Sequence, residues 1–252
     1  MKSKILVLAL AVATIAAIAF FNTNTAQASI KTTPHNLSPS SSGTGTVHAT
    51  GTQQDAEICQ WCHTPHSANT AFAGSAPLWN KESTAINART FTAYGQTLAG
   101  TTVGQPSGSS KACLSCHDGV DAINSIVLDV DTGINSNATG SNVAFGATAA
   151  GTAVLMPAGA ATDIGTDLTG VHPLSVTYTA GKASLVATSS TFGVGGTIAK
   201  VLDTTGNIQC SSCHDPHAAQ GDLTSVGTQT AGDYFLRMSN AGSALCLTCH
   251  AK

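Results

Sequence analysis

All eight cysteines of this 252-residue chain lie in four copies of one short motif, C-x-x-C-H, at 59–63, 113–117, 210–214 and 246–250. This motif attaches c-type haem. Its two thiols form thioethers with the porphyrin, and the histidine that follows reaches the iron as an axial ligand. The predicted thioether cysteines are Cys59, Cys62, Cys113, Cys116, Cys210, Cys213, Cys246 and Cys249. The spacing therefore predicts four covalently bound haem c groups, with four proximal iron ligands: His63, His117, His214 and His250.

Three other uses of paired cysteines agree less well with the sequence. Exported chains commonly use cysteines for disulfides, but a disulfide gives no reason for a histidine after every second cysteine. A zinc ribbon places two C-x-x-C knuckles about 15–20 residues apart, and here neighbouring motifs lie further apart. Thioredoxin-like chemistry needs one C-x-x-C motif rather than four. Covalent haem attachment is therefore the preferred interpretation.

An internal repeat orders the rest of the chain. Each half carries His-x-Leu-Ser, then C-x-x-C-H-x-Pro-His, then a second C-x-x-C-H. The first two of these patterns occur at 35–38 and 59–66 in the first half, and at 172–175 and 210–217 in the second half. We therefore expect a single tetrahaem domain over 29–252, made of two dihaem half-repeats at about 29–125 and 165–252.

Five histidines lie outside the proximal positions. Four of them recur in the repeat and are the predicted distal ligands: His35, His66, His172 and His217. His66 would have to pass around the porphyrin edge to reach the iron that His63 holds, so we expect it to reach the iron of a neighbouring haem. His48 has no counterpart in the repeat and is a candidate for a distal or inter-subunit ligand. With four proximal and four distal histidines, each of the four irons would have two histidine ligands.

The composition suits a core built from cofactor rather than from side chains. Charged residues make up 9% of the chain and aromatic residues 5%, whereas a typical soluble domain has about 25% charged residues. The formal net charge of −3 excludes a strongly basic nucleic-acid-binding protein. We expect few regular elements: a multihaem cytochrome c with a haem core, short helices around the C-x-x-C-H motifs, a few short β-strands and long loops.

Short segments between the motifs favour extended structure. We expect strands within 126–130, 174–178 and 183–187, with a hairpin joining the last two, and a turn at 192–196. The segment 32–54 is rich in Ser, Thr and Gly and is expected to be irregular.

Residues 1–28 have the three parts of a secretory signal peptide: a basic start, an apolar run and a small-x-small cleavage signature. The apolar run at 5–21 is short for a transmembrane helix, which needs about 20 residues. We therefore expect cleavage after Ala28 and export of 29–252, with no membrane span in the mature chain. Export predicts an extracellular or cell-surface location, with the periplasm as the alternative.

Several segments resemble exported multihaem c-type cytochromes with paired C-x-x-C-H motifs. They are Cys-Gln-Trp-Cys-His-Thr-Pro-His at 59–66, Ala-Pro-Leu-Trp-Asn at 76–80, Ala-Cys-Leu-Ser-Cys-His-Asp-Gly at 112–119 and Phe-Leu-Arg-Met-Ser-Asn at 235–240. The chain looks most like the tetrahaem subunits of extracellular cytochrome filaments (nanowires) of metal-reducing bacteria, over essentially all of 29–252. This resemblance implies a continuous stack of haems and one distal histidine supplied by the neighbouring subunit, for which His35 and His48 are the candidates.

Two axial histidines leave no open iron position for a substrate and favour electron exchange. We therefore expect an electron carrier rather than an enzyme, polymerising into an extracellular electron-conducting filament through subunit–subunit haem ligation. Its partners would be copies of itself, other redox proteins or extracellular electron acceptors, and no nucleic acid. A discrete periplasmic electron shuttle is the alternative. A multihaem reductase is less favoured, because such enzymes usually need a five-coordinate haem and no C-x-x-C-K motif occurs here.

Overall fold

The computed structural model describes residues 30, 33–39, 47–49, 58–72, 75–96, 98, 101–129, 133–134, 145, 152–193, 196–217 and 235–251. All eight cysteines and all nine histidines lie among them. The expected signal peptide at 1–28 and much of the segment 32–54 lie outside the described residues. None of the helices in the described part combines the length and the hydropathy that a bilayer-spanning segment needs.

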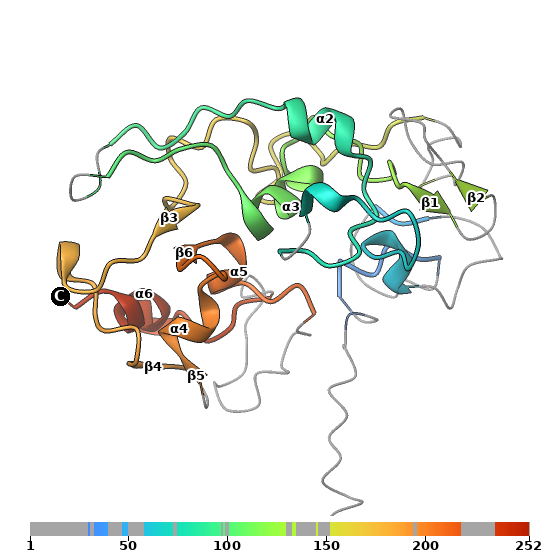
Figure 1. Cartoon of the computed structure of the whole chain (residues 1–252). Coiled ribbons are helices and arrows are strands. Elements are labelled where there is room, and N and C mark those ends of the chain that lie inside the picture. Colours follow the sequence, from blue (N-terminus) through green and yellow to red (C-terminus); the bar gives the residue numbers. More distant parts are fainter. Residues whose placement is uncertain are drawn as a thin grey trace, which may run out of the picture.

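Regular structure is sparse, and much of it surrounds the C-x-x-C-H motifs (Figure 1). The motifs lie on the 3-10 helix η2 (Ile58–Trp61) and on the helices α3 (Gly108–His117), α5 (Cys210–Cys213) and α6 (Ala244–Cys249). The expected short helices around the motifs are therefore present. The other helical turns are η3 (Thr70–Phe72), α2 (Ser83–Ala88), η4 (Lys182–Ser184), α4 (Ile198–Val201) and η5 (Ala241–Ser243).

Each motif forms about one helical turn because its backbone closes a helical hydrogen bond. The N–H of the motif histidine donates to the carbonyl oxygen of the first cysteine, at 2.8 Å for His63, 3.0 Å for His214 and 2.9 Å for His250. Residues four apart lie on the same face of a helix. The first cysteine and the histidine of a motif therefore share one face, as attachment of a single haem requires.

The strands are short and form antiparallel pairs. The pairs are β1 (Leu128–Asp129) with β2 (Gly133–Ile134), β3 (Val176–Thr177) with β6 (Asn207–Ile208), and β4 (Thr191–Phe192) with β5 (Gly196–Thr197). β1 and β3 lie within the segments expected to be extended at 126–130 and 174–178. The pairing of β4 with β5 shows that the chain reverses between them, as expected for the turn at 192–196.

The strand expected at 183–187 and its hairpin are wrong. β3 pairs with β6, much later in the chain, instead of with 183–187. Gly181 adopts a left-handed conformation with φ of +80° and leads into the 3-10 turn η4. Leu185 then forms an isolated bridge with His250, so contacts from a distant segment decide the conformation here.

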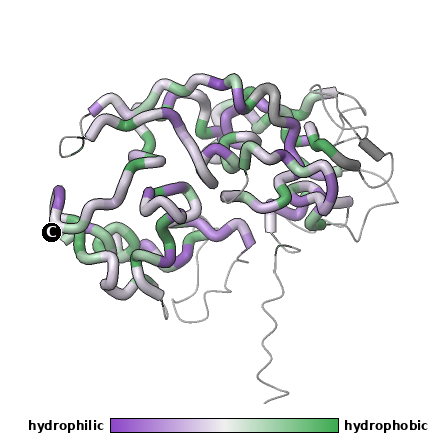
Figure 2. Tube along the Cα trace, in the orientation of Figure 1, coloured by the Kyte–Doolittle hydropathy of each residue, from purple (hydrophilic) through white to green (hydrophobic). Residues whose placement is uncertain are grey.

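Small apolar clusters are distributed along the chain instead of forming one large core, and Figure 2 shows the apolar stretches scattered along the trace. One cluster includes Phe72, Ile86, Phe91, Leu114 and Leu168, a second Ala49, Trp61, Ile123, Ile126 and Phe145, and a third Tyr178, Phe192, Ile198 and Leu245. Cys62 and Cys116 pack against the second cluster, and Cys213 and Cys249 against the third. Each half therefore holds the second cysteines of its two motifs against one cluster.

The two halves meet where α3 packs against α5, and polar side chains hold this junction together. The Ser110 hydroxyl donates to Gln209 Oε1 at 2.6 Å and accepts the N–H of Cys210 at 2.9 Å. The hydroxyls of Ser109 and Ser211 lie 2.6 Å apart. Both Ser110 and Gln209 are buried. We call these residues, Ser109, Ser110, Gln209, Cys210 and Ser211, the polar seam.

Candidate haem-ligating site

Three of the predicted proximal histidines each face a predicted distal histidine. The ring centroids lie 6.0 Å apart for His63 and His217, 6.1 Å for His117 and His35, and 6.4 Å for His250 and His172. A metal–imidazole nitrogen bond is about 2.0 Å long, so two rings on opposite sides of one metal ion have centroids about 6 Å apart. Each pair therefore fits the two axial ligands of one iron. The differing angles between ring planes do not oppose this fit, because each ring can turn about its metal–nitrogen bond.

Backbone carbonyls orient four of these six rings. Nδ1 lies 2.7 Å from the carbonyl oxygen of Pro77 in His63, 2.8 Å from that of Thr162 in His117, 3.0 Å from that of Pro173 in His172, and 3.4 Å from that of Pro216 in His35. A ring that donates through Nδ1 keeps Nε2 for a metal ion. Metal-binding histidines commonly have this arrangement, because the second bond fixes both the tautomer and the ring orientation.

His35 is held in place inside the chain. Its ring stacks on Phe235 with a centroid distance of 4.2 Å. Burial and, next, the nearby ring of His117 lower the pKa of His35 to about 4. The ring is therefore neutral at neutral pH, which is the state that binds metal ions. His35, one of the two residues considered for inter-subunit ligation, contacts His117 of its own chain.

His217 differs from the carbonyl-bonded rings because its Nδ1 faces a carboxylate. Nδ1 lies 3.7 Å from Oδ1 of Asp215, and Oδ2 of Asp215 lies 3.3 Å from Nη1 of Arg237. The His217 ring, with a further contribution from Arg237, lowers the pKa of Asp215 to about 2. Asp215 in turn raises the pKa of His217. Asp215 is therefore ionised at neutral pH.

The structure does not bring every predicted ligand against another histidine. His66 is exposed, and among the described residues its ring makes no hydrogen bond, ion pair or ring contact, although its backbone bonds to Thr64. His48 is half-buried, with Nδ1 2.9 Å from the carbonyl oxygen of Ala49. His214 is exposed, and its backbone bridges to Leu236. Of the five distal candidates, His66 and His48 are thus the two that face no histidine ring within the described part of the chain.

The internal repeat appears again in the backbone hydrogen bonds that follow the first motif of each half. In the first half, Thr64 N–H donates to Leu78 and Asn80 N–H donates to Cys62, each at 2.8 Å. In the second half, Asp215 N–H donates to Phe235 at 2.7 Å and Arg237 N–H donates to Cys213 at 2.8 Å. Thr64 and Asp215, and likewise Asn80 and Arg237, therefore occupy equivalent positions.

Asn80 and Arg237 lie in two of the segments that carry the resemblance, but the sequence assigned their side chains no role. The Asn80 amide donates to the carbonyl oxygen of Gln60, and the Arg237 guanidinium donates through Nε to that of Ser211 at 2.6 Å. Gln60 and Ser211 are the equivalent residues after the first cysteine of each motif. Both side chains therefore clamp their motif at the equivalent carbonyl oxygen. The segments around Asn80 and Arg237 share no identical residues, so the sequence alone does not align them.

Contacts between thiols show which motifs are neighbours. Burial first, then the nearby thiol of Cys116, raises the pKa of Cys62 to about 12. Burial and Cys249 raise the pKa of Cys213 to about 11 in the same way. Across the polar seam Cys113 lies against Cys210, and this contact is the largest cause that raises the pKa of Cys113 and lowers that of Cys210 to about 7. The motifs therefore neighbour one another in sequence order, from first to fourth.

The cysteines form neither disulfides nor the ligand cluster of a zinc ribbon. No disulfide joins any two of the eight. Within the described residues no three His, Cys, Asp or Glu side chains converge as they would around a metal ion, so the ligand cluster of a zinc ribbon is not formed. An iron held by a porphyrin and two histidines needs no such cluster.

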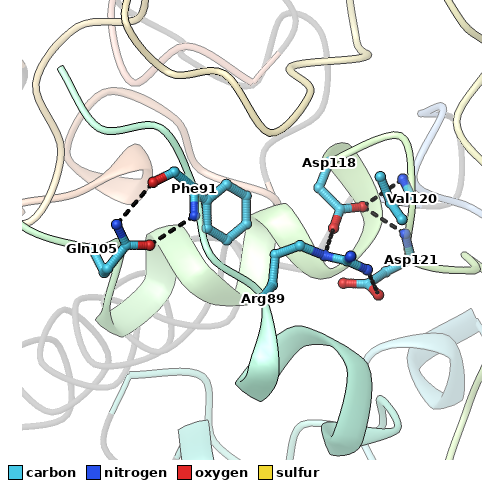
Figure 3. Close-up of polar contacts among 6 residues, drawn as sticks. All are labelled: Arg89, Phe91, Gln105, Asp118, Val120 and Asp121. Atoms are coloured by element: carbon cyan, nitrogen blue, oxygen red, sulfur yellow. Dashed lines mark hydrogen bonds and ion pairs between the residues drawn. The ribbon is translucent and has the colours of Figure 1, made fainter. Parts of the chain in front are cut away.

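A second polar cluster fixes the turn that follows His117 (Figure 3). The Arg89 guanidinium lies 2.7 Å from Oδ1 of Asp121 and 3.3 Å from Oδ2 of Asp118. Oδ1 of Asp118 accepts the N–H groups of Val120 and Asp121 at 2.9 and 2.7 Å. Burial and, next, the neighbouring Asp118 raise the pKa of Asp121 to about 6. The two carboxyl groups and Arg89 thereby hold the end of α3 in one conformation.

A scan against protein-family models and a search of the curated proteins find no match to this chain. The histidine pairs and the motifs themselves are therefore what support a function.

Proposed function

We propose that this chain is an electron-transfer tetrahaem c-type cytochrome and a polymerising subunit of an extracellular electron-conducting filament. The observation that carries the proposal is the spacing of three histidine pairs, 6.0–6.4 Å between ring centroids, each including the histidine of a C-x-x-C-H motif. In this proposal the motif cysteines hold the porphyrins covalently and the paired histidines bind iron from both sides. When bound, haem supplies a one-electron iron couple whose potential depends on its ligands and surroundings.

Ligation by two histidines suits electron transfer better than catalysis. An iron with both axial positions filled has no place for a substrate, and the work of the protein is then to orient and tune the cofactor. The carbonyl oxygens of Pro77 and Thr162 fix the rings of His63 and His117 through Nδ1. Rings fixed in this way favour the same ligand geometry in both oxidation states of the iron.

The direction of the repeat supports polymerisation. His217 belongs to the second half and pairs with His63 of the first half. His66, the first-half equivalent of His217, is exposed and points to no histidine ring among the described residues. Within the chain, a histidine of the second half thus pairs with the first motif of the first half. If this relation continues from one copy to the next, His66 of the following copy pairs with His214. A step that repeats without closing joins copies head to tail into a filament.

Two exposed cysteine-bearing surfaces are available for such a step. Inside the chain, Cys113 on α3 lies against Cys210 on α5. Their repeat equivalents, Cys246 on α6 and Cys59 on η2, are both exposed, and α6 and the segment around 58–61 lie on opposite sides of the molecule in Figure 1. A second copy would cover both.

Leucines at equivalent positions of the repeat also differ in exposure, one being buried inside the chain and the other exposed. Leu114 on α3 is 1% exposed, whereas its equivalent on α6, Leu247, is 48% exposed. Leu114 packs in the first apolar cluster, to which Leu168 contributes from the segment before His172. In the proposed filament the segment before His35 of the next copy would lie over Leu247.

Composition and ligation are tested first. The exported protein should have the mass of its polypeptide plus four haems. Filaments reduced with dithionite should take up almost no carbon monoxide, because every iron is six-coordinate. Stoichiometric uptake by the wild-type filament would favour a multihaem reductase instead. Electron microscopy of shed extracellular material should show long thin filaments, and dispersed particles alone would favour a discrete periplasmic shuttle.

Single substitutions then test the contact between copies. His66→Ala is expected to abolish filaments while four haems stay attached, and His48→Ala to leave filaments intact. The opposite result would assign the inter-subunit ligand to His48. Leu247→Asp should also leave dispersed tetrahaem protein, because a carboxylate at that position disfavours burial by the next copy. Filaments that persist in Leu247→Asp would contradict the proposed contact.

A further inference from the structure

The repeat provides an internal comparison at the turn after the first motif of each half. Thr64 Oγ1 accepts the N–H of His66 at 3.4 Å, and Asp215 Oδ1 accepts the N–H of His217 at 3.0 Å. The two turns thus share one backbone arrangement. The turn in the first half carries a neutral hydroxyl, whereas the turn in the second half carries a carboxylate.

A second difference accompanies the first. Oδ2 of Asp215 lies 3.3 Å from Nη1 of Arg237, and Nε of Arg237 is fixed on the carbonyl oxygen of Ser211 at 2.6 Å. In the first half the clamp position equivalent to Arg237 is Asn80, which is neutral. A charged pair therefore accompanies His217 where the first half has two neutral side chains.

The charge lies on the side of the ring away from the predicted iron position. Nδ1 of His217 is 3.7 Å from Oδ1 of Asp215. The same ring also pairs with the ring of His63. By contrast, the rings of His63, His117 and His172 direct Nδ1 to neutral carbonyl oxygens. The carboxylate thus distinguishes His217 from these three rings.

We propose that Asp215 tunes the iron between His63 and His217, making it harder to reduce, and that Arg237 moderates this effect. The inference rests on the proposed function, because it requires a haem iron at that position. The negative charge of a carboxylate 3.7 Å from a ligating ring stabilises the more positive, ferric state of the iron. Reduction adds one electron from an external donor to the ferric iron, and no ligand bond forms or breaks. The chain thereby sets a low-potential step at the iron that joins its two halves.

The repeat itself supplies the test substitutions. Asp215→Thr and Arg237→Asn install the first-half residues in the second half. Asp167→Asn is the matched control, because it removes one negative charge at an exposed residue that bonds to Thr169 and to no histidine. Each holoprotein is titrated potentiometrically with redox mediators, and the reduction of its four haems is followed by haem absorbance.

Asp215→Thr is expected to make one of the four haems about tenfold easier to reduce, an upward shift of about 59 mV for one electron. Arg237→Asn is expected to shift the same haem in the opposite direction, because the carboxylate then lacks its cation. The double variant should fall between the two. Loss of packing alone would not give shifts of opposite sign.

Unchanged titrations in both variants, or a shift as large in Asp167→Asn, would overturn the tuning role. If Asp215→Thr does not fold, the isosteric Asp215→Asn gives the same comparison. Haem content and the bis-histidine spectrum are measured on the same samples. Absence of four bis-histidine haems in the wild type would refute the proposed function, whereas intact haems with unchanged potentials would refute only the role of Asp215.

Discussion

Removing one distal histidine at a time would test the pairing most directly. On the proposed function, His172→Ala would leave His250 as the only histidine on its iron, because the two rings face each other at 6.4 Å. His35→Ala does the same for His117, whose ring lies 6.1 Å away. Each variant should convert one iron in four from six-coordinate to five-coordinate.

The structure also predicts how much each variant costs in stability. His172 is exposed, so beyond the lost metal bond its removal should change the free energy of unfolding by no more than about 0.5 kcal/mol. His35 stacks on Phe235 at 4.2 Å, and loss of such a ring contact costs about 0.5–1.5 kcal/mol more. His172→Ala should therefore unfold at higher denaturant concentration than His35→Ala.

If the proposed filament forms, carbon monoxide uptake by the reduced filaments would measure the open irons. The wild type should bind almost none, and each single variant should bind one molecule per chain. The double variant should bind two. Uptake by neither variant, with four haems attached, would mean that these histidines do not ligate iron. Uptake of more than one molecule by His172→Ala would mean that the pairs depend on one another.

Three further outcomes follow from single contacts. Lys81→Met should lower the free energy of unfolding by about 2–3 kcal/mol in a denaturant titration, because the buried ammonium donates to two backbone carbonyls; an unchanged midpoint would contradict this. Ser110→Ala, which removes two buried bonds of the polar seam, should cost about 1–3 kcal/mol, and more than Ser109→Ala, which loses one partly buried bond. Because Asp121 has a raised pKa of about 6, the folded state binds more protons than the unfolded state between about pH 4 and 6. The free energy of unfolding should therefore fall by up to about 3 kcal/mol as pH rises through that window. Asp121→Asn should flatten this dependence, and equal slopes in both proteins would refute it.

The local structure of the motifs could be predicted because their spacing demands it. A haem needs two thiols and a histidine on one face, and a helical turn with His63 bonded to Cys59 supplies that. The sparse regular structure likewise follows from a chain in which only 5% of the residues are aromatic. These features depend on residues close in sequence.

Features that depend on distant segments could not be predicted. The pairing of His63 with His217 depends on how α3 packs against α5. The hairpin expected at 180–182 fails because Leu185 bridges to His250 and β3 pairs with β6. The internal repeat predicted a set of distal ligands, but only the packing of the two halves indicates which iron each ligand would serve.

The pairing of His63 with His217 across the two halves has a consequence for how such chains could change in length. A half separated from its neighbour would lose the ring that completes its first iron, so a stable protein with only two haems is disfavoured. Lengthening is easier, because a duplicated copy of 165–252 would bring the same histidine and the same cysteine-bearing surface to the end it extends. On the proposed function, gene duplication would thus lengthen the electron-conducting path in units of two haems, with each new unit completing the one before it.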